Sequence, residues 1–201
     1  MFTRRNLIQA GAAAAVLGSA RPVFASARPP YPFINPDLME RARAALDDKS
    51  RLLKTRDVIA IADFARPSRE ERFYLVHTDS GIVTSYHVAH GRGSDPAHSG
   101  YLNRFSNEPG SAASSAGAYV TGDYYQGKYG RSMRLRGLDE SNSNAGPRGI
   151  VVHAAPYAEP EMLGQYGKLG RSEGCFALSQ LGLFLVFTQL GPGRLLYCDK
   201  V

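Results

Sequence analysis

Hydrophobic residues recur at helical spacing in two parts of the chain. The first part follows Asn35, a residue type that commonly caps helices, and has a proline at the first helical position. It predicts a helix over residues 36–49, followed by a less regular helical piece over 50–55. The second part begins at Ser179 and stops before Gly191-Pro192-Gly193. The positions that share one face are Leu38, Ala42, Ala45 and Leu46 in the first helix, and Leu181, Phe184, Leu185 and Thr188 in the second.

Between these helices the apolar residues form the short runs and two-residue alternation that are typical of β-strands. Strands are predicted at residues 58–62, 73–78, 82–90, 118–122, 132–138, 150–153 and 194–198. Asp79-Ser80-Gly81 separates the second and third runs and indicates a hairpin turn. The pattern therefore predicts a mainly β domain with helices at its margins and no internal repeat.

The middle of the chain is rich in glycine. Eleven of the 21 glycines lie between Gly91 and Gly149, together with many serines and asparagines. A flexible connector is the simplest interpretation, but interleaved residues such as Tyr119, Tyr124 and Tyr129 supply too much apolar surface for disorder. Long loops that approach a ligand closely need glycine, so we expect these segments to form the walls of a groove.

The N-terminus has the pattern of a targeting segment. Arg4 and Arg5 precede a mildly apolar run over residues 7–20, and small-residue cleavage patterns follow up to Ala27. We predict a twin-arginine-type signal peptide over residues 1–27, and therefore a periplasmic or cell-envelope location. The run is shorter than the roughly 20 apolar residues that span a bilayer, so no transmembrane anchor is expected after signal removal. A proline-rich linker over 28–36 and one catalytic domain over 37–201 complete the predicted organisation.

The charge of the mature chain is only mildly positive. The whole sequence has 24 basic and 18 acidic residues, and the predicted signal holds Arg4, Arg5 and Arg21 but no acid. Removing it leaves 21 bases and 18 acids, a net charge of +3. This surplus does not favour nucleic acid as a partner, although it suits an anionic polymer of the cell envelope.

The candidate chemistry lies at two strand-like runs. The first run, residues 150–152, is followed directly by His153. The second run, residues 176–178, is preceded directly by Gly174 and Cys175. A thiol nucleophile usually has a basic partner, so we interpret the pair as a nucleophile and an imidazole base on neighbouring strands. The alternative is a buried cysteine and a histidine that never meet. A disulfide between Cys175 and Cys198 would consume the nucleophile, and Cys198 is favoured as a small buried residue of the last strand.

A series of short motifs, in this order, resembles the murein L,D-transpeptidase catalytic domain family in its YkuD-like second branch. The motifs are Ala62-Asp63-Phe64, Pro67-Ser68, His90-Gly91-Arg92-Gly93-Ser94, Phe105-Ser106-Asn107, Gly110-Ser111, Ser114-Ser115, Gly117, Tyr119, Tyr129-Gly130-Arg131-Ser132, Leu135-Arg136-Gly137-Leu138, residues 142–145, Arg148, Val151-Val152-His153-Ala154 and Gly170-Arg171-Ser172 with Gly174-Cys175. The resemblance implies an L,D-transpeptidase-type β-sandwich with a few peripheral helices. It also implies acyl transfer between donor and acceptor peptidoglycan stem peptides through a cysteine thioester, without a cofactor or metal.

The resemblance assigns roles to individual residues. It implies that Cys175 is the nucleophile, that His153 is the general base, and that Ser172 and Gly174 belong to the catalytic signature. We expect the backbone N–H of Cys175, with that of Gly174 or a neighbour, to stabilise the oxyanion. Glu173 replaces a histidine of the broader signature, and Ala177 replaces an arginine. Expected substrate contacts, which include two candidates for that missing arginine, are Arg171, Arg148, His90, Asn107 and Ser132.

Three alternatives differ in chemistry. An L,D-carboxypeptidase would use the same thioester and pass it to water. A catalytically weak peptidoglycan-binding protein would keep the groove without turnover. A metal site would draw its ligands from His77, His87, His90 and His98, with Asp79 or Asp95. Strand geometry opposes that site, because residues three apart on a strand point to opposite faces.

Overall fold

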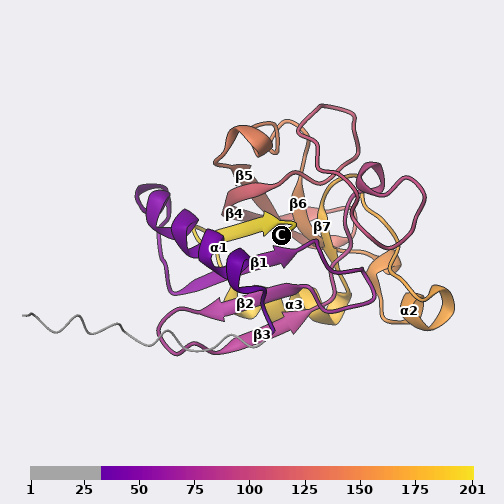
Figure 1. Cartoon of the computed structure of the whole chain (residues 1–201), viewed down its shortest axis with the longest axis horizontal. Coiled ribbons are helices and arrows are strands. Elements are labelled where there is room, and N and C mark those ends of the chain that lie inside the picture. The colour runs from indigo at the N-terminus through magenta and orange to yellow at the C-terminus, as the bar shows by residue number, and fades with distance from the viewer. Residues whose placement is uncertain (1–32) are drawn as a thin grey trace, which may run out of the picture.

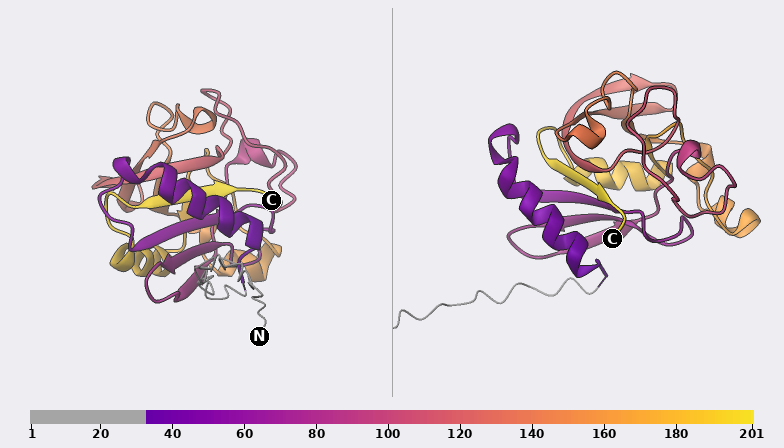
Figure 2. Two further views of the ribbon diagram at one scale, coloured as in Figure 1. Left: turned by 60° about the vertical axis from the view of Figure 1, so that its left-hand side comes forward. Right: turned by 45° about the horizontal axis from the view of Figure 1, so that its top comes forward.

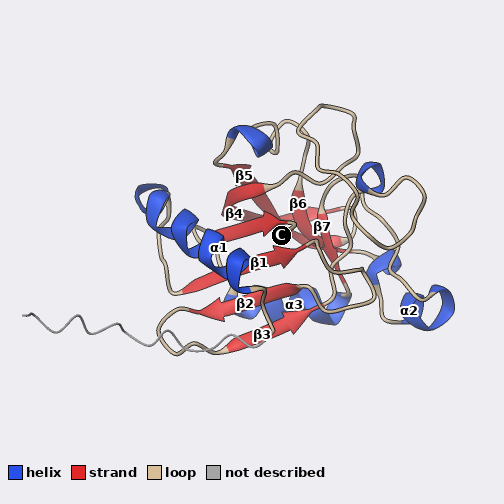
Figure 3. Cartoon of the chain, in the orientation of Figure 1, coloured by secondary structure: helices blue, strands red, loops and turns tan. Residues whose placement is uncertain are grey.

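The computed structural model describes residues 33–201. The predicted signal peptide and most of the predicted linker lie outside the described residues, so these two assignments stay predictions. Eight strands form one mixed sheet in the order β3-β2-β1-β8-β4-β5-β6-β7 (Figures 1 and 3). The strands are β1 Val58–Asp63, β2 Phe73–His77, β3 Val83–Tyr86, β4 Gly117–Gly127, β5 Gly130–Gly137, β6 Val151–Ala154, β7 Phe176–Leu178 and β8 Leu195–Asp199. The predicted mainly β class is confirmed.

The sheet curls back on itself. Ala89, shortly after β3 at one edge, forms an antiparallel bridge with Ala177 of β7 at the opposite edge. The two layers that a sandwich implies are therefore parts of one continuous sheet. Their inner faces enclose the main hydrophobic core, to which seven of the strands contribute. Representative core residues are Ala60, Phe73, Tyr119, Met133, Val152, Phe176 and Leu196.

A long helix covers the outer face of the sheet, as Figure 2 shows. Helix α1, Pro36–Asp48, begins as predicted, with the Asn35 side chain accepting a hydrogen bond from the Asp37 N–H. Its buried face packs on Ile59, Ile61 and other residues of β1, β2 and β8 in a second core. A 3₁₀ turn, η1 Ser50–Leu52, follows where the irregular helical piece was predicted.

The face of the last helix differs from the prediction. Helix α3, Gln180–Gln189, starts at the expected Ser179 cap. However, Leu181 and Phe184 of the predicted apolar face are 67% and 63% exposed, whereas Leu183 and Val186 are buried in the main core. Nearly every side chain from 181 to 187 is apolar, so spacing alone did not determine which face packs inward.

The segments between the strands contain further turns and short helices. The β4–β5 hairpin is longer than predicted and turns at Lys128-Tyr129, where Gly130 has a φ of +94°. Glycine tolerates this left-handed backbone without a Cβ clash. Between β6 and β7 lies the short helix α2, Glu161–Tyr166. Three further 3₁₀ turns are η2 Arg92–Ser94, η3 Glu140–Asn142 and η4 Pro156–Ala158.

Candidate active site

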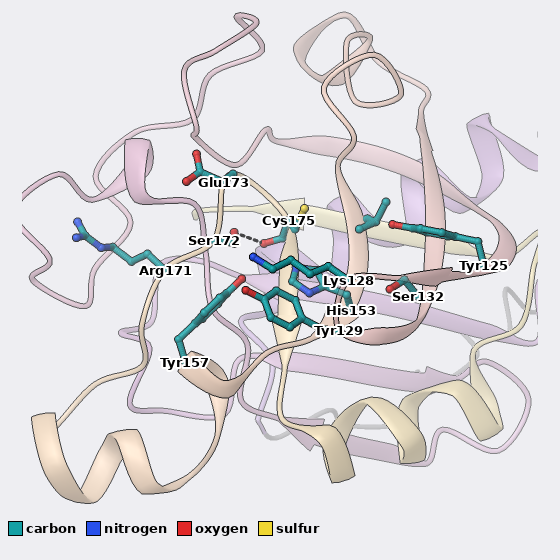
Figure 4. A pocket seen from close by; sticks show the side chains of 11 residues that line it. Tyr125, Lys128, Tyr129, Ser132, His153, Tyr157, Arg171, Ser172, Glu173 and Cys175 are labelled. Atoms are coloured by element: carbon teal, nitrogen blue, oxygen red, sulfur yellow. Dashed lines mark hydrogen bonds between the residues drawn. The ribbon is translucent and has the colours of Figure 1, made fainter.

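Parallel pairing of β6 with β7 brings the predicted nucleophile and base to one pocket. In this pair Val152 lies opposite Phe176 and His153 opposite Ala177, so Cys175 immediately precedes β7, beside the strand that carries His153. Both line a cavity of about 390 Å³ (Figure 4). The other lining residues are Tyr125, Lys128, Tyr129, Ser132, Val151, Tyr157, Arg171, Ser172 and Glu173.

The His153 imidazole is arranged to accept a proton. Its Nδ1 lies 2.8 Å from the Ala154 carbonyl oxygen, which only accepts hydrogen bonds. Nδ1 therefore carries the hydrogen, and Nε2 keeps a lone pair. Burial lowers the pKa of His153, which favours the neutral form near neutral pH. The Tyr129 ring stacks over the imidazole with centroids 5.7 Å apart and an interplanar angle of 11°.

The Cys175 thiol rests against the backbone that precedes His153. Its Sγ donates to the Gly149 carbonyl oxygen at 3.5 Å. Burial raises the pKa of Cys175 and outweighs the Val151 N–H and the positive charge of Arg148, which lower it. Among the described residues, no hydrogen bond joins Sγ to His153. The resting site is therefore a neutral thiol beside a neutral imidazole.

The turn before the nucleophile is closed by Ser172. Its hydroxyl accepts a hydrogen bond from the Gly174 N–H at 3.1 Å and donates one to the Cys175 carbonyl at 2.7 Å. This corrects one expectation, because the Gly174 N–H is already used and does not face an oxyanion. Gly174 has a φ of +118°, and a Cβ there would lie 2.7 Å from the Ala113 oxygen. The turn therefore requires glycine at this position.

Two of the expected substrate contacts have their polar groups committed to loops. The Arg148 guanidinium donates to the carbonyls of Ser106 and Ala113 and to the hydroxyls of Ser111 and Ser115. The Asn107 amide donates to Glu140 O and Ser143 Oγ and accepts from Asn144 N. Neither residue lines the pocket. In this structure their donors hold backbone carbonyls and serine hydroxyls of the loops, so the expected substrate contacts stay a prediction that the geometry does not favour.

His90 is likewise part of a buried network. Its side chain is 1% exposed, with Nδ1 2.7 Å from Arg72 Nη2 and Nε2 3.5 Å from Asp95 Oδ2. Its carbonyl accepts the Ser172 N–H at 2.9 Å. The buried His90 side chain therefore lies behind the turn that carries Cys175, where it does not line the pocket.

The other two expected contacts do line the pocket. Ser132 lies on β5, with its hydroxyl donating to Gly130 O. Arg171 contributes its aliphatic stem, while its guanidinium points away from Cys175 and donates to the carbonyls of Asp95 and Pro96 (Figure 4). Glu173, at the edge of the same pocket, forms an exposed ion pair with Arg92 at 2.7 Å.

Tyr129 belongs to the glycine-rich segments that were expected to form groove walls, whereas Lys128 and Tyr157 were not singled out in the sequence. Lys128 and Tyr129 come from the β4–β5 turn, Tyr125 from β4, and Tyr157 from η4. The Lys128 ammonium lies 5.1 Å from the Tyr129 ring centroid. The available signal was the turn itself, since a cation and an aromatic residue stand between two glycines in an otherwise regular hairpin.

Neither a disulfide nor a cluster of metal-ligating side chains is found in the described part of the chain. Cys175 and Cys198 are both free thiols, and Cys198 is buried in β8 as predicted. Between residues 33 and 201, no three His, Cys, Asp or Glu side chains gather to hold a metal ion. His77, His87 and His98 instead contact Gln189, Arg69 and Leu169 respectively. None of the helices in this range has both the length and the hydropathy needed to cross a bilayer.

Comparison with known proteins identifies the family. Residues 32–198 match the model of the L,D-transpeptidase catalytic domain. This match covers most of the sequence, so the chain belongs to the L,D-transpeptidase catalytic domain family. No curated protein matches the chain.

Several solved structures are similar to it at low identity, among them the following three. An L,D-transpeptidase from Mycobacterium smegmatis is 14% identical over 71% of this chain and 58% of its own, with a TM-score of 0.44. One from Mycobacterium tuberculosis H37Rv is 16% identical over 72% and 58%, with a TM-score of 0.42. L,D-transpeptidase 3 from Mycobacterium tuberculosis, solved with a faropenem-derived adduct, is 13% identical over 72% and 60%, with a TM-score of 0.45. The chain thus spans about three fifths of the length of these proteins, and the family assignment rests on the sequence match.

Proposed function

We propose that the protein is a peptidoglycan L,D-transpeptidase that transfers an acyl group through a Cys175 thioester. The observation that carries this proposal is the meeting of the Cys175 thiol and the His153 imidazole in one pocket, from neighbouring strands. The imidazole is neutral and has its Nε2 lone pair available. A neutral base beside a thiol is suited to generating a thiolate at the moment of attack.

The reaction follows from the resting arrangement. The S–H bond turns from Gly149 O, and His153 Nε2 accepts the proton. The Cys175 thiolate then attacks an amide carbonyl at an L-configured centre of the donor stem. As the tetrahedral intermediate collapses, the imidazolium gives the proton to the leaving amine, and a thioester remains. An acceptor amine attacks this thioester and passes a proton to His153. The proton returns to the sulfur when the thiolate leaves.

We assign the oxyanion to the backbone N–H of Cys175. The Gly174 N–H is bound by Ser172 Oγ, so Ser172 acts by holding the turn that aims this group. Losing one oxyanion donor typically reduces the rate by about 10²–10³. Ser132 and the stem of Arg171 are the proposed substrate contacts, because both line the pocket.

Transfer to an amine is favoured over transfer to water by the aromatic walls of the pocket. Tyr125, Tyr129 and Tyr157 surround the two reacting side chains. Excluding water and holding the acceptor raise the effective concentration of its amine. Mass spectrometry of a tetrapeptide muropeptide, with and without an added acceptor amine, tests this choice. Cross-linked or amine-exchanged product that Cys175→Ala abolishes is expected. Tripeptide as the sole product at every acceptor concentration would identify an L,D-carboxypeptidase.

The catalytically weak binding protein is separated by a second measurement. Alkylated protein that still sediments with murein sacculi, from a wild type that shows no turnover, would identify a binding module. The transpeptidase is expected to lose its turnover on alkylation, because the thiol forms the thioester.

We place the enzyme in the cell envelope, exported through the twin-arginine-type signal of residues 1–27. Arg4 and Arg5 before a weakly apolar run support this route. Replacing both with lysine is expected to leave precursor in the cytoplasm. Unchanged appearance of mature protein in the envelope would show that export uses another route.

A further inference from the structure

One arginine connects the loop behind the pocket to the nucleophile. Arg148 Nη1 donates to Ser106 O and Ser115 Oγ, both at 2.7 Å. Its Nη2 donates to Ser111 Oγ at 3.2 Å and to Ala113 O. The two terminal nitrogens of a guanidinium carry four hydrogens, so these four bonds use them all. The guanidinium is therefore fixed in place and has no terminal donor left for a substrate.

The loop held by Arg148 packs directly against the residue before Cys175. A Cβ on Gly174 would lie 2.7 Å from Ala113 O and 3.3 Å from Arg148 Nη2. Ser114 Oγ also donates to the Gly174 carbonyl at 3.2 Å. Movement of residues 106–115 would thus move the turn that presents the thiol.

The residues that follow Arg148 hold the sulfur itself. Gly149 O accepts a hydrogen bond from Cys175 Sγ at 3.5 Å, and the Val151 N–H lowers the pKa of the same thiol. Gly149 has a φ of +65°, a conformation that side chains with a Cβ rarely adopt. One short segment, residues 148–151, therefore combines a fixed positive charge with a carbonyl and an N–H at the sulfur.

We propose that Arg148 is a positioning residue for the nucleophile, which holds residues 106–115 against the Gly174–Cys175 turn and places a fixed positive charge beside the sulfur. The charge opposes the effect of burial on the thiol and favours the thiolate when His153 removes the proton. The inference rests on the proposed function only in taking Cys175 as the reacting group. It differs from the substrate-binding role expected from the sequence.

The test is the pH dependence of Cys175 alkylation by iodoacetamide, followed by peptide mass mapping in wild type, Arg148→Gln and Arg148→Lys. We expect Arg148→Gln to raise the pH midpoint of Cys175 alkylation by about 0.5 to 1 unit. Alkylation at a pH below the midpoint should therefore be about threefold to tenfold slower than in wild type. Arg51→Gln is the matched control, because Arg51 is an exposed arginine of η1, outside the pocket. Superimposable profiles for wild type and folded Arg148→Gln would overturn the proposal.

If Arg148→Gln does not fold, Arg148→Lys tests the proposed role of Arg148 in its place. Lysine keeps the charge but offers fewer donors, so we expect a lower melting temperature and a midpoint within about 0.3 unit of wild type. A midpoint shift of about one unit in this folded variant would contradict the electrostatic role. In transpeptidation, folded Arg148 variants should lower kcat and leave KM unchanged. A raised KM with an unchanged alkylation profile would instead assign Arg148 to substrate binding. Alkylation needs no peptidoglycan, so failure of the transpeptidase assay leaves this test readable.

Discussion

The buried histidine behind the catalytic turn should make the stability of the protein depend on pH. His90 Nδ1 lies 2.7 Å from Arg72 Nη2, which only donates, so Nδ1 carries the lone pair and Nε2 the hydrogen. Arg72 is itself fully buried and also donates to the carbonyls of Val88 and Arg66. Burial, followed by the charge of Arg72, lowers the pKa of His90 from 6.5 to about 3.

The direction and size of the pH effect on stability follow from the difference between the pKa of His90 in the unfolded and in the folded chain. Between pH 6.5 and about 3, the unfolded chain binds a proton at position 90 and the folded chain does not, so stability falls as the pH falls. Each unit of difference corresponds to about 1.4 kcal/mol, which gives up to about 5 kcal/mol over the full range. Between pH 7.5 and 4.5 the loss from this residue should be about 2–3 kcal/mol.

Urea unfolding of wild type and His90→Gln at the two pH values measures the effect. Glutamine offers Arg72 a carbonyl acceptor and does not titrate. We therefore expect the stability advantage of wild type over the variant to shrink by about 2–3 kcal/mol from pH 7.5 to 4.5. His87→Gln, which removes a partly exposed imidazole, is the matched control. Equal losses of unfolding free energy in wild type and His90→Gln would refute the reasoning.

Three further variants separate structure from chemistry. Cys198→Ala should retain turnover and lose about 1–2 kcal/mol in thermal unfolding, because a fully buried thiol is removed; inactivation at unchanged stability would contradict a structural role. Tyr129→Ala should expose His153, raise the pKa of His153 and move the acid limb of the pH–rate profile to higher pH, whereas Tyr129→Phe should leave that limb in place. An unchanged acid limb in Tyr129→Ala would show that the Tyr129 ring does not shield the base. Ser172→Ala should cost about 1–3 kcal/mol, since Gly174 N–H and Cys175 O lose their partner, with the alkylation midpoint unchanged; a shifted midpoint at full stability would indicate a chemical role.

The elements that could be predicted were those with a local cause. Asn35 and the spacing after it determine α1, and short apolar runs or alternation indicate the strands. The inward face of α3 was not predictable, because its apolar residues surround the helix and only the packing of Leu183 and Val186 distinguishes one side. The curl that joins Ala89 to Ala177 is a tertiary contact with no local signal.

In the site, residue type indicated chemistry better than it indicated orientation. His153 ends one recognisable run and Cys175 precedes another, and pairing of these two strands brings both residues to one pocket. Arg148, His90 and Asn107 belong to the same motifs, yet their polar groups hold backbone or other buried side chains. A polar residue required by a loop and one required by a substrate look alike in a sequence. Their partners, often more than 30 residues away, distinguish them only in the folded chain.

Detection of the acyl-enzyme tests the proposed Cys175 thioester without relying on any later step of the reaction. Purified mature protein, mixed with a tetrapeptide stem and quenched in acid, would be measured by intact-protein mass spectrometry with peptide mapping. We expect a mass increase equal to the donor stem without its terminal residue and without water, located on Cys175. Adding an acceptor amine should remove this adduct as cross-linked product appears, and Cys175→Ala should form neither. Turnover that persists in Cys175→Ala would contradict the proposal that Cys175 is the nucleophile and carries the acyl group.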